Sequence, residues 1–187
     1  MIRPAYIRDM NEICELIYFI MQDKQSYFTE NFPKDTVMSF IKHLYVQDMS
    51  YFSYKFIIVQ DIGATIAGIA LGYDGILNTE FQKQWEPSVE EYFGKDEDEF
   101  ESSEAQHDEF HLDTLAVVEA FRGQGIGSSL LNAVEQIARL QGHHKFSLNV
   151  SVDNPSAQKL YEKHGFVMDS SFHISEHLYY HMIKPLI

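Results

Sequence analysis

The sequence predicts an α/β (α+β) fold, with a sheet of six to seven strands flanked by about four helices in a single domain of 187 residues (1–187). Two kinds of periodicity lead to this prediction. Some segments alternate apolar and polar side chains, which is typical of strands, and others repeat apolar side chains every three or four residues, which is typical of helices. The third observation is a strand that runs into a glycine-rich turn and then a helix, at residues 110–138.

The first elements are a short strand at residues 2–6 and two helices. Asp9 with Glu12 three residues later has the spacing of a capping box, and apolar side chains follow at helical intervals. The second helix begins after Pro33 or Asp35 and also carries one apolar face. Both helices are therefore expected to pack on the sheet through one side.

A β-hairpin is predicted next. Residues 54–60 and 64–73 form its two apolar arms, and Asp61-Ile62-Gly63 between them is a turn sequence. Three later segments complete the set of strands that follow the central one: residues 146–151, 166–172 and 177–183.

Residues 73–109 form an acidic insertion, which is longer than a strand connection requires. Acidic side chains are densest at Asp96–Glu99, and the large rings of Trp85, Tyr92 and Phe93 are interleaved with others. Large rings in a solvated loop gain nothing unless they pack. Two interpretations stay open: a solvated, partly disordered loop, or a partly helical flap.

The strand that begins at Phe110 leads into a glycine-rich segment and a helix. On simple alternation, one face of the strand carries Phe110, Leu112, Thr114 and Ala116, and the other carries His111, Asp113, Leu115 and Val117. The segment itself reads Arg122-Gly123-Gln124-Gly125-Ile126-Gly127-Ser128. Glycines let the backbone approach a ligand closely, and the first N–H groups of a helix have no partners within it. The segment therefore predicts a site for phosphate or pyrophosphate.

Two familiar nucleotide motifs do not fit this segment. A dinucleotide motif G-x-G-x-x-G that starts at Gly123 needs a third glycine where Ser128 stands, and one that starts at Gly125 needs it where Leu130 stands. A P-loop needs a lysine followed by Ser or Thr, and no lysine lies near. The phosphate of a different ligand is expected.

A second motif lies in the last helix, at residues 154–166, and reads N-P-S-A-Q-K-L-Y-E-K-H-G-F. Asn154 is a good N-cap, Pro155 suits the first helical position, and Gly165 ends the helix. Tyr161 projects a phenol from the middle of this helix.

Together the two segments resemble the GNAT superfamily of N-acetyltransferases. Arg122, Gly125 and Gly127 match its acetyl-CoA signature, Q/R-x-x-G-x-G/A, and residues 154–166 match its second signature, N-x-x-A-x-x-L-Y-x-x-x-G-F, at every fixed position. The resemblance implies the GNAT fold, with a central mixed, mostly antiparallel sheet, and acetyl-CoA as co-substrate. It covers nearly the whole chain except the acidic insertion before the fourth strand.

The resemblance also implies roles for particular residues. Tyr161 would protonate the departing thiolate, although it can also be an ordinary core aromatic residue. The layout H-L-D-T-L-A-V resembles the aralkylamine branch, in which two histidines occupy the positions of His111 and Asp113. His111 is thus a candidate base, and Asp113 is its acidic neighbour. Two alternatives remain open: His111 has a structural role, or the base is Glu109 or a water. The residues expected to bind acetyl-CoA are Leu115, Ala116, Val117, Arg122, Gly123, Gln124, Gly125, Ile126, Gly127, Ser128, Asn154 and Ser156. The proposed chemistry needs no metal.

Charge and composition limit the partners. The formal net charge of -14 argues against nucleic acid and anionic membranes, and it suits a cationic amine, although solubility alone also explains it. No apolar run is long enough to span a membrane, there is no signal-peptide pattern, and Cys14 is the single cysteine, so a cytoplasmic location is expected. The closing strands, at 167–172 or 178–183, can pair across a homodimer.

The function expected from these features is acetyl-CoA-dependent N-acetyl transfer to a primary amine, by direct attack in a ternary complex. The amine is either a small cationic molecule or a peptide or protein amine. The alternative is a catalytically silent GNAT-like module that binds acyl-CoA as a regulator. Tyr161 and the pair His111 and Asp113 favour the enzyme, because a regulator has no need of them.

Overall fold

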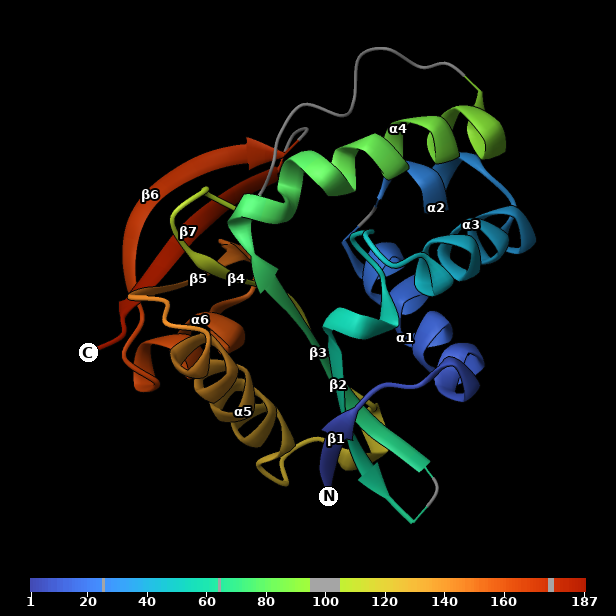
Figure 1. Ribbon diagram of the computed structural model, residues 1–187. Coiled ribbons are helices and arrows are strands. Elements are labelled where there is room, and N and C mark those ends of the chain that lie inside the picture. Colours follow the sequence, from blue (N-terminus) through green and yellow to red (C-terminus); the bar gives the residue numbers. More distant parts are fainter. Residues whose placement is uncertain (25, 64, 95–104, 175–176) are drawn as a thin grey trace.

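A seven-stranded sheet in the order β1-β2-β3-β4-β5-β7-β6 runs through the molecule in the computed structural model (Figure 1). The structure describes residues 1–24, 26–63, 65–94, 105–174 and 177–187. All neighbouring strands are antiparallel except β4 and β5, which are parallel. The predicted mixed, mostly antiparallel sheet is confirmed. The strands are β1 Ile2–Pro4, β2 Ile57–Ile62, β3 Thr65–Asp74, β4 Phe110–Val117, β5 Lys145–Ser151, β6 Val167–Ile174 and β7 His177–Pro185.

Helices cover the two faces of this sheet, and alternate strand residues point to each side. On β2, Ile57 and Val59 join the core cluster formed with the first helices, whereas Ile58 joins the cluster on the other face. The first face is covered by α1 (Met10–Asp23), α2 (Tyr27–Asn31), α3 (Lys34–Val46) and α4 (Asn78–Phe93), and the second by α5 (Ile126–Leu140) and α6 (Pro155–Lys163). Each layer therefore buries one apolar stripe of its helices.

The acidic insertion contains α4, so its interpretation as partly helical is confirmed for residues 78–93. Aromatic rings attach this helix to α2 and α3. The ring centroid of Phe93 lies 4.6 Å from that of Phe28 and 4.9 Å from that of Phe40, and Trp85 lies 5.2 Å from Phe40. This burial of rings holds an otherwise acidic helix on the protein. The acidic run Asp96–Glu99 lies outside the described residues.

Two local predictions in the first half of the chain are wrong. Glu12 does not complete a capping box, because its Oε2 accepts a hydrogen bond from the N–H of Ile66 on β3 at 3.2 Å. Residues 54–56 form a 3-10 helix rather than the start of a strand, since the hydroxyl of Ser53 accepts from the N–H of Lys55. In both cases a side-chain oxygen accepts a hydrogen bond from a backbone N–H that the local sequence pattern does not predict as its partner.

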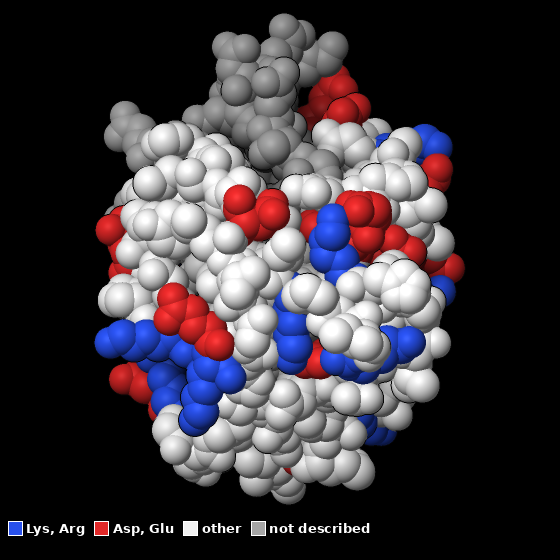
Figure 2. Space-filling view, turned by 90° about the vertical axis from the view of Figure 1, so that its left-hand side faces the viewer, with Lys and Arg blue, Asp and Glu red and all other residues white. Residues whose placement is uncertain are grey.

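The surface carries its charge unevenly. Figure 2 shows Lys and Arg side chains in a few groups on one side of the molecule, separated by acidic groups and by wide uncharged areas. Among the described helices, none is both long and apolar enough to cross a bilayer.

Candidate active site

Strand β4 contains a bulge at Asp113. Leu71 of β3 pairs with Thr114 and the next residue, Gly72, pairs with Leu112, so Asp113 is an extra residue on β4. A bulge re-phases the strand that contains it. The expected alternation is therefore wrong beyond this point.

The two halves of β4 show the change of phase. Leu115 and Val117 pack in the same cluster as Phe110 and Leu112, and Ala116 packs in the opposite one. His111 and Asp113 still share a side, because each contacts Tyr73: its ring lies 5.9 Å from that of His111, and its hydroxyl lies 3.5 Å from Asp113 Oδ2.

Strands β4 and β5 pair over a short length only. Their register joins Phe110, His111 and Leu112 to Phe146, Ser147 and Leu148, and it ends there. Among the described residues, β5 therefore offers no ladder partner to the backbone of residues 113–117, on the edge of β4 that faces it. An edge of this kind can receive the amide groups of an extended ligand by hydrogen bonds.

The glycine-rich segment joins β4 to α5 with two residues that favour glycine. Gly123 and Gly125 have φ angles of 74° and 77°, in the left-handed region where a side chain is strained. The first ladder bond of α5 runs from Ser129 N to Gly125 O at 3.0 Å. The N–H groups of residues 126–128 precede it, so they have no acceptor within the helix. This is the arrangement that the sequence predicted for a phosphate-binding turn.

The two signature segments meet in space. A Cβ added at Gly127 would lie 3.7 Å from Val117 Cγ2 and 3.9 Å from Leu160 Cδ2, so α5 begins between the end of β4 and the side of α6. Ser128 Oγ also lies 3.1 Å from Nε2 of His164, the residue that follows α6. Arg122 is exposed and donates from Nε to Val117 O at 3.2 Å, and Gln124 is exposed beside it.

Helix α6 begins as predicted. Asn154 Oδ1 accepts from Ala157 N at 3.1 Å and from Ser156 Oγ at 2.9 Å, so Asn154 is the N-cap and Pro155 follows it. Capping uses Oδ1 and leaves the Nδ2 group of Asn154 to donate elsewhere. Tyr161 is half-buried against Phe166, with ring centroids 6.0 Å apart. Burial raises the pKa of Tyr161 to about 12, so its phenol keeps its proton at neutral pH.

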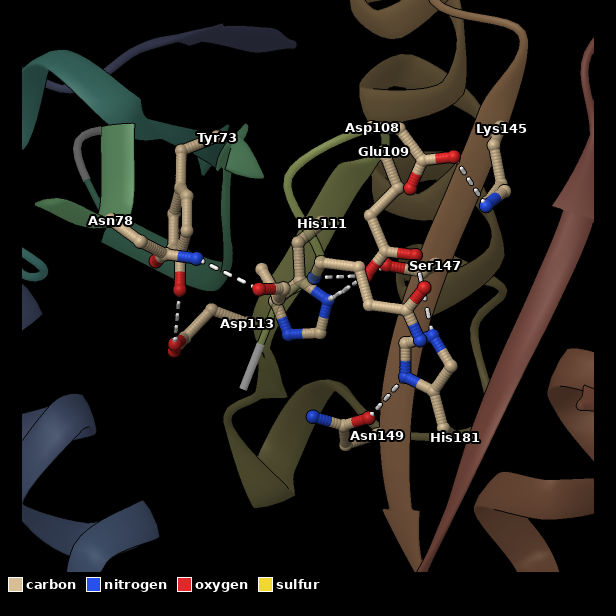
Figure 3. A network of polar contacts seen from close by, with 12 residues as sticks. Tyr73, Asn78, Asp108, Glu109, His111, Asp113, Lys145, Ser147, Asn149 and His181 are labelled. Atoms are coloured by element: carbon tan, nitrogen blue, oxygen red, sulfur yellow. Dashed lines mark hydrogen bonds and ion pairs between the residues drawn. The ribbon is translucent and has the colours of Figure 1, made fainter. Parts of the chain in front are cut away.

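A polar network occupies the interior where β4, β5 and β7 run side by side (Figure 3). Glu109, His111 and Ser147 are fully buried, and His181 is 3% exposed. His111 Nδ1 lies 2.8 Å from Ser147 Oγ, and His181 joins Glu109 Oε2 through Nε2 at 3.2 Å. His181 Nδ1 lies 2.8 Å from Asn149 Oδ1. Polar groups this deep are stable only when they are hydrogen-bonded to one another.

Glu109 stays ionised within this network. Burial alone raises the pKa of its carboxyl group, but hydrogen bonds from His181, from the N–H of Gln106 and from Ser147 outweigh burial, and the net pKa is lowered. Its Oε1 lies 3.9 Å from His111 Nδ1, too far for a hydrogen bond but close enough for charges to interact. Asp113 instead accepts from the hydroxyls of Thr114 at 2.8 Å and Tyr73 at 3.5 Å.

Residues 17–166 match the model of the family described as "Acetyltransferase (GNAT) family". The match covers most of the chain. The chain belongs to the GNAT family. A curated relative, the uncharacterized N-acetyltransferase YycN of Bacillus subtilis, is 39% identical over 66 residues, which is 35% of this chain and only 42% of that protein.

Solved structures support the same family. The crystal structure of an N-acetyltransferase from Staphylococcus aureus Mu50 superimposes with a TM-score of 0.86 at 30% identity, over 98% of this chain and 100% of that one. The structure of yncA from Salmonella typhimurium, solved with its cofactor acetyl-CoA, has a TM-score of 0.63 at 15% identity, over 100% of this chain and 94% of that one. The second likeness concerns the fold alone.

In this GNAT chain, sequence reasoning missed part of the buried network. His111 and Asp113 were singled out on β4, but Ser147, Asn149 and His181 were not. Their signal was weak: Ser147 and Asn149 are polar residues on the side of β5 opposite its apolar residues, and His181 is a polar residue in an aromatic strand. In the described ranges, no group of three or more His, Cys, Asp or Glu side chains is arranged to hold a metal ion.

Proposed function

We propose that this protein is an acetyl-CoA-dependent N-acetyltransferase that moves an acetyl group to a primary amine by direct attack in a ternary complex. The amine is a small cationic molecule or a peptide or protein amine. The observation that carries the proposal is the meeting of the two signature segments at the end of β4, where Gly127 is close to both Val117 and Leu160, beyond the stretch in which β4 no longer pairs with β5. Family membership and the acetyl-CoA bound by yncA support the choice of co-substrate.

The chain has groups suited to each part of such a co-substrate. The N–H groups of residues 126–128 suit the pyrophosphate, since they lie at the positive end of α5. The open edge of β4 at residues 113–117 suits the amides of the pantetheine arm. At the exposed start of α6, Asn154 can donate from Nδ2, and the oxygen of Ser156, whose hydrogen is directed to Asn154 Oδ1, can accept a hydrogen bond. The thioester supplies an activated acetyl group, and the residues of the chain supply orientation and proton transfer.

Two protons must move during the reaction. An alkylamine has a pKa of about 10.4, so only about one molecule in 2,500 is neutral at pH 7, a deficit of roughly 4.6 kcal/mol. The neutral nitrogen attacks the carbonyl carbon, the C–N bond forms and the C–S bond breaks. We assign the proton of the nitrogen to His111 and the proton that neutralises the leaving thiolate to Tyr161. The phenol of Tyr161 is suited to this because its pKa of about 12 keeps it protonated.

The test is an assay of free thiol with acetyl-CoA and a panel of acceptors. The panel contains small diamines, aromatic alkylamines and peptides with a free α-amine, and each product is checked for one added acetyl group by mass spectrometry. Thiol release that depends on one class of acceptor supports the enzyme and names its substrate class. Tight binding of CoA without acceptor-dependent thiol release from any member would favour the regulatory module instead.

A further inference from the structure

The hydrogen-bond directions around Ser147 can be deduced from the charge of Glu109. An ionised carboxylate only accepts hydrogen bonds, so the hydroxyl of Ser147 donates to Glu109 in the bond between them. The oxygen of Ser147 then has only lone pairs to offer His111, whose Nδ1 lies 2.8 Å away. His111 Nδ1 must therefore carry the hydrogen. In the neutral ring the lone pair is then on Nε2.

Glu109 is itself held on both oxygens. Its Oε1 accepts from the N–H of Gln106 at 2.8 Å, and its Oε2 accepts from His181 Nε2 at 3.2 Å. His181 is held in turn by Asn149 on β5, at 2.8 Å from Nδ1. Because its partners come from β5, β7 and the segment before β4, the carboxylate cannot turn away from Ser147 without breaking contacts in three places.

We propose that Glu109 and Ser147 are positioning residues, which fix His111 in the tautomer that presents Nε2 as the proton acceptor and which stabilise the imidazolium that forms. This inference rests on the proposed function, because it assigns His111 the role of base. When Nε2 takes the proton of the attacking amine, Nδ1 keeps its hydrogen bond to Ser147. The new positive charge then lies 3.9 Å from Glu109 Oε1, measured from Nδ1. His181 holds the carboxylate in place.

The surrounding charges define the expected pH behaviour. The titratable side chains around His111 include Glu109 just before β4, Asp113 on β4, Tyr73 on β3 and His181 on β7. A negative charge beside an imidazolium raises its pKa. Replacing Glu109 by Gln removes such a charge but keeps the shape of the side chain, so the pKa of His111 falls. The lower inflection of kcat/KM then moves to lower pH, by about one unit.

The decisive measurement is the tautomer of His111, which does not require activity. Long-range ¹H–¹⁵N NMR of the ¹⁵N-histidine-labelled protein, with His111 assigned by its loss in His111→Gln, separates a neutral ring protonated on Nδ1 from one protonated on Nε2. We expect the Nδ1–H form in the wild type and a return toward the Nε2–H form in Ser147→Ala. A wild-type ring protonated on Nε2 would overturn the proposal, whatever the enzyme acetylates.

Kinetics give the second readout. Ser147→Ala should lower kcat by about tenfold at unchanged KM for acetyl-CoA, less than the 10²-fold or more expected for loss of the base itself. The matched control is Ser53→Ala, which also removes a fully buried serine hydroxyl but lies at the start of a 3-10 helix outside the site. An equal loss of kcat in both variants would reduce Ser147 to a structural role. If the NMR result holds and no acceptor is found, the network stands and the proposed function fails.

Discussion

Tyr161 and His111 lie in environments that differ as their proposed roles require. Tyr161 packs against Phe166 on the side of α6, and burial raises its pKa to about 12, which keeps the proton on the phenol at neutral pH. His111 is fully buried among hydrogen-bonding groups and lies 3.9 Å from an ionised carboxylate. The first environment favours a donor at neutral pH, and the second favours a ring that can accept a positive charge.

Tyr161→Phe tests the donor. The change keeps the ring and its contact with Phe166 but removes the hydroxyl, so the thiolate must leave without a proton. We expect kcat to fall by about 10²-fold or more, with CoA affinity unchanged in calorimetry. Phe166→Leu is the control, because it disturbs the same contact and leaves the hydroxyl. An undiminished kcat in Tyr161→Phe would return this residue to a packing role.

His111→Gln tests the base. If the imidazole takes the proton, kcat/KM of the wild type rises with pH through an inflection that belongs to His111, and the variant lacks this inflection. The profile needs an acceptor amine of low pKa, so that ionisation of the amine itself does not overlap. Because His111 is fully buried, the variant must first be shown to unfold cooperatively near the wild-type temperature. An inflection that persists unaltered would move the role to Glu109, Asp113 or a water.

The single residues could be predicted from sequence only where a motif marked them. Asn154 was recognised as a cap from its place before Pro155, and the structure confirms it. Glu109 and His181 could not be paired, because they are 72 positions apart and meet only when β7 lies next to β5. No local pattern carries that information. It depends on strand order, which periodicity does not reveal.

At the scale of elements, the strand–turn–helix unit was predicted in its parts but not in its details. The sequence predicted the break at Gly123 and Gly125 and the start of α5. In the structure both glycines occupy left-handed backbone positions. The bulge at Asp113 was not readable, since no glycine or proline marks it and simple alternation assigned Leu115 and Val117 to the face of His111. Helix α2 was missed because five residues are too few to show a helical period.

Gly127→Val tests the turn as a phosphate site. Gly127 is helical, and a Cβ there would make only ordinary contacts, at 3.7 and 3.9 Å, so the fold tolerates a side chain better than at Gly125, whose φ is 77°. The branched side chain would nevertheless stand over the N–H groups that precede the first ladder bond. We expect CoA affinity to fall by about tenfold or more, which is at least roughly 1.4 kcal/mol, in calorimetry on the folded variant.

The control for this change is Ser129→Val, which places the same side chain at an exposed position in the same helix, at the residue whose N–H makes the first ladder bond. Its CoA affinity should stay near that of the wild type. Unchanged affinity in Gly127→Val itself would mean that the pyrophosphate lies elsewhere.

At the scale of the whole molecule, the order of the strands along the chain followed from the sequence, whereas the mixed sheet followed from the family resemblance. The acidic run Asp96–Glu99 would suit the attraction of a cationic acceptor, but it lies outside the described residues, so this role is a hypothesis. The described part of the insertion contributes exposed carboxylates on α4, at Glu86, Glu90 and Glu91. The formal net charge of -14 is thus compatible with a cationic acceptor without identifying one.

A carboxylate on α5 that is bonded to β7 should contribute to the loss of stability in acid. Glu135 on α5 accepts from Lys184 of β7 at 2.6 Å and from Arg139 at 2.8 Å. Burial raises the pKa of Glu135, but these two partners outweigh burial and leave it lowered. A carboxyl group with a lowered pKa in the folded state stabilises the protein above its unfolded pKa, near 4.3, and this contribution is lost as the pH falls through the folded value.

Glu135→Gln should therefore lower the free energy of unfolding at pH 7 by about 1–3 kcal/mol, because it leaves Lys184 and Arg139 without their shared anion. At pH 2.5, which is below the unfolded pKa of the group, the unfolded wild-type chain already binds a proton there, so the gap between the two proteins should narrow. Urea unfolding at both pH values measures this. Glu15→Gln is the matched control, because Glu15 forms an exposed pair with Lys34 at 2.8 Å, and it should leave the free energy of unfolding almost unchanged at either pH. A gap of equal size at both pH values would show that Glu135 acts through packing rather than through its charge.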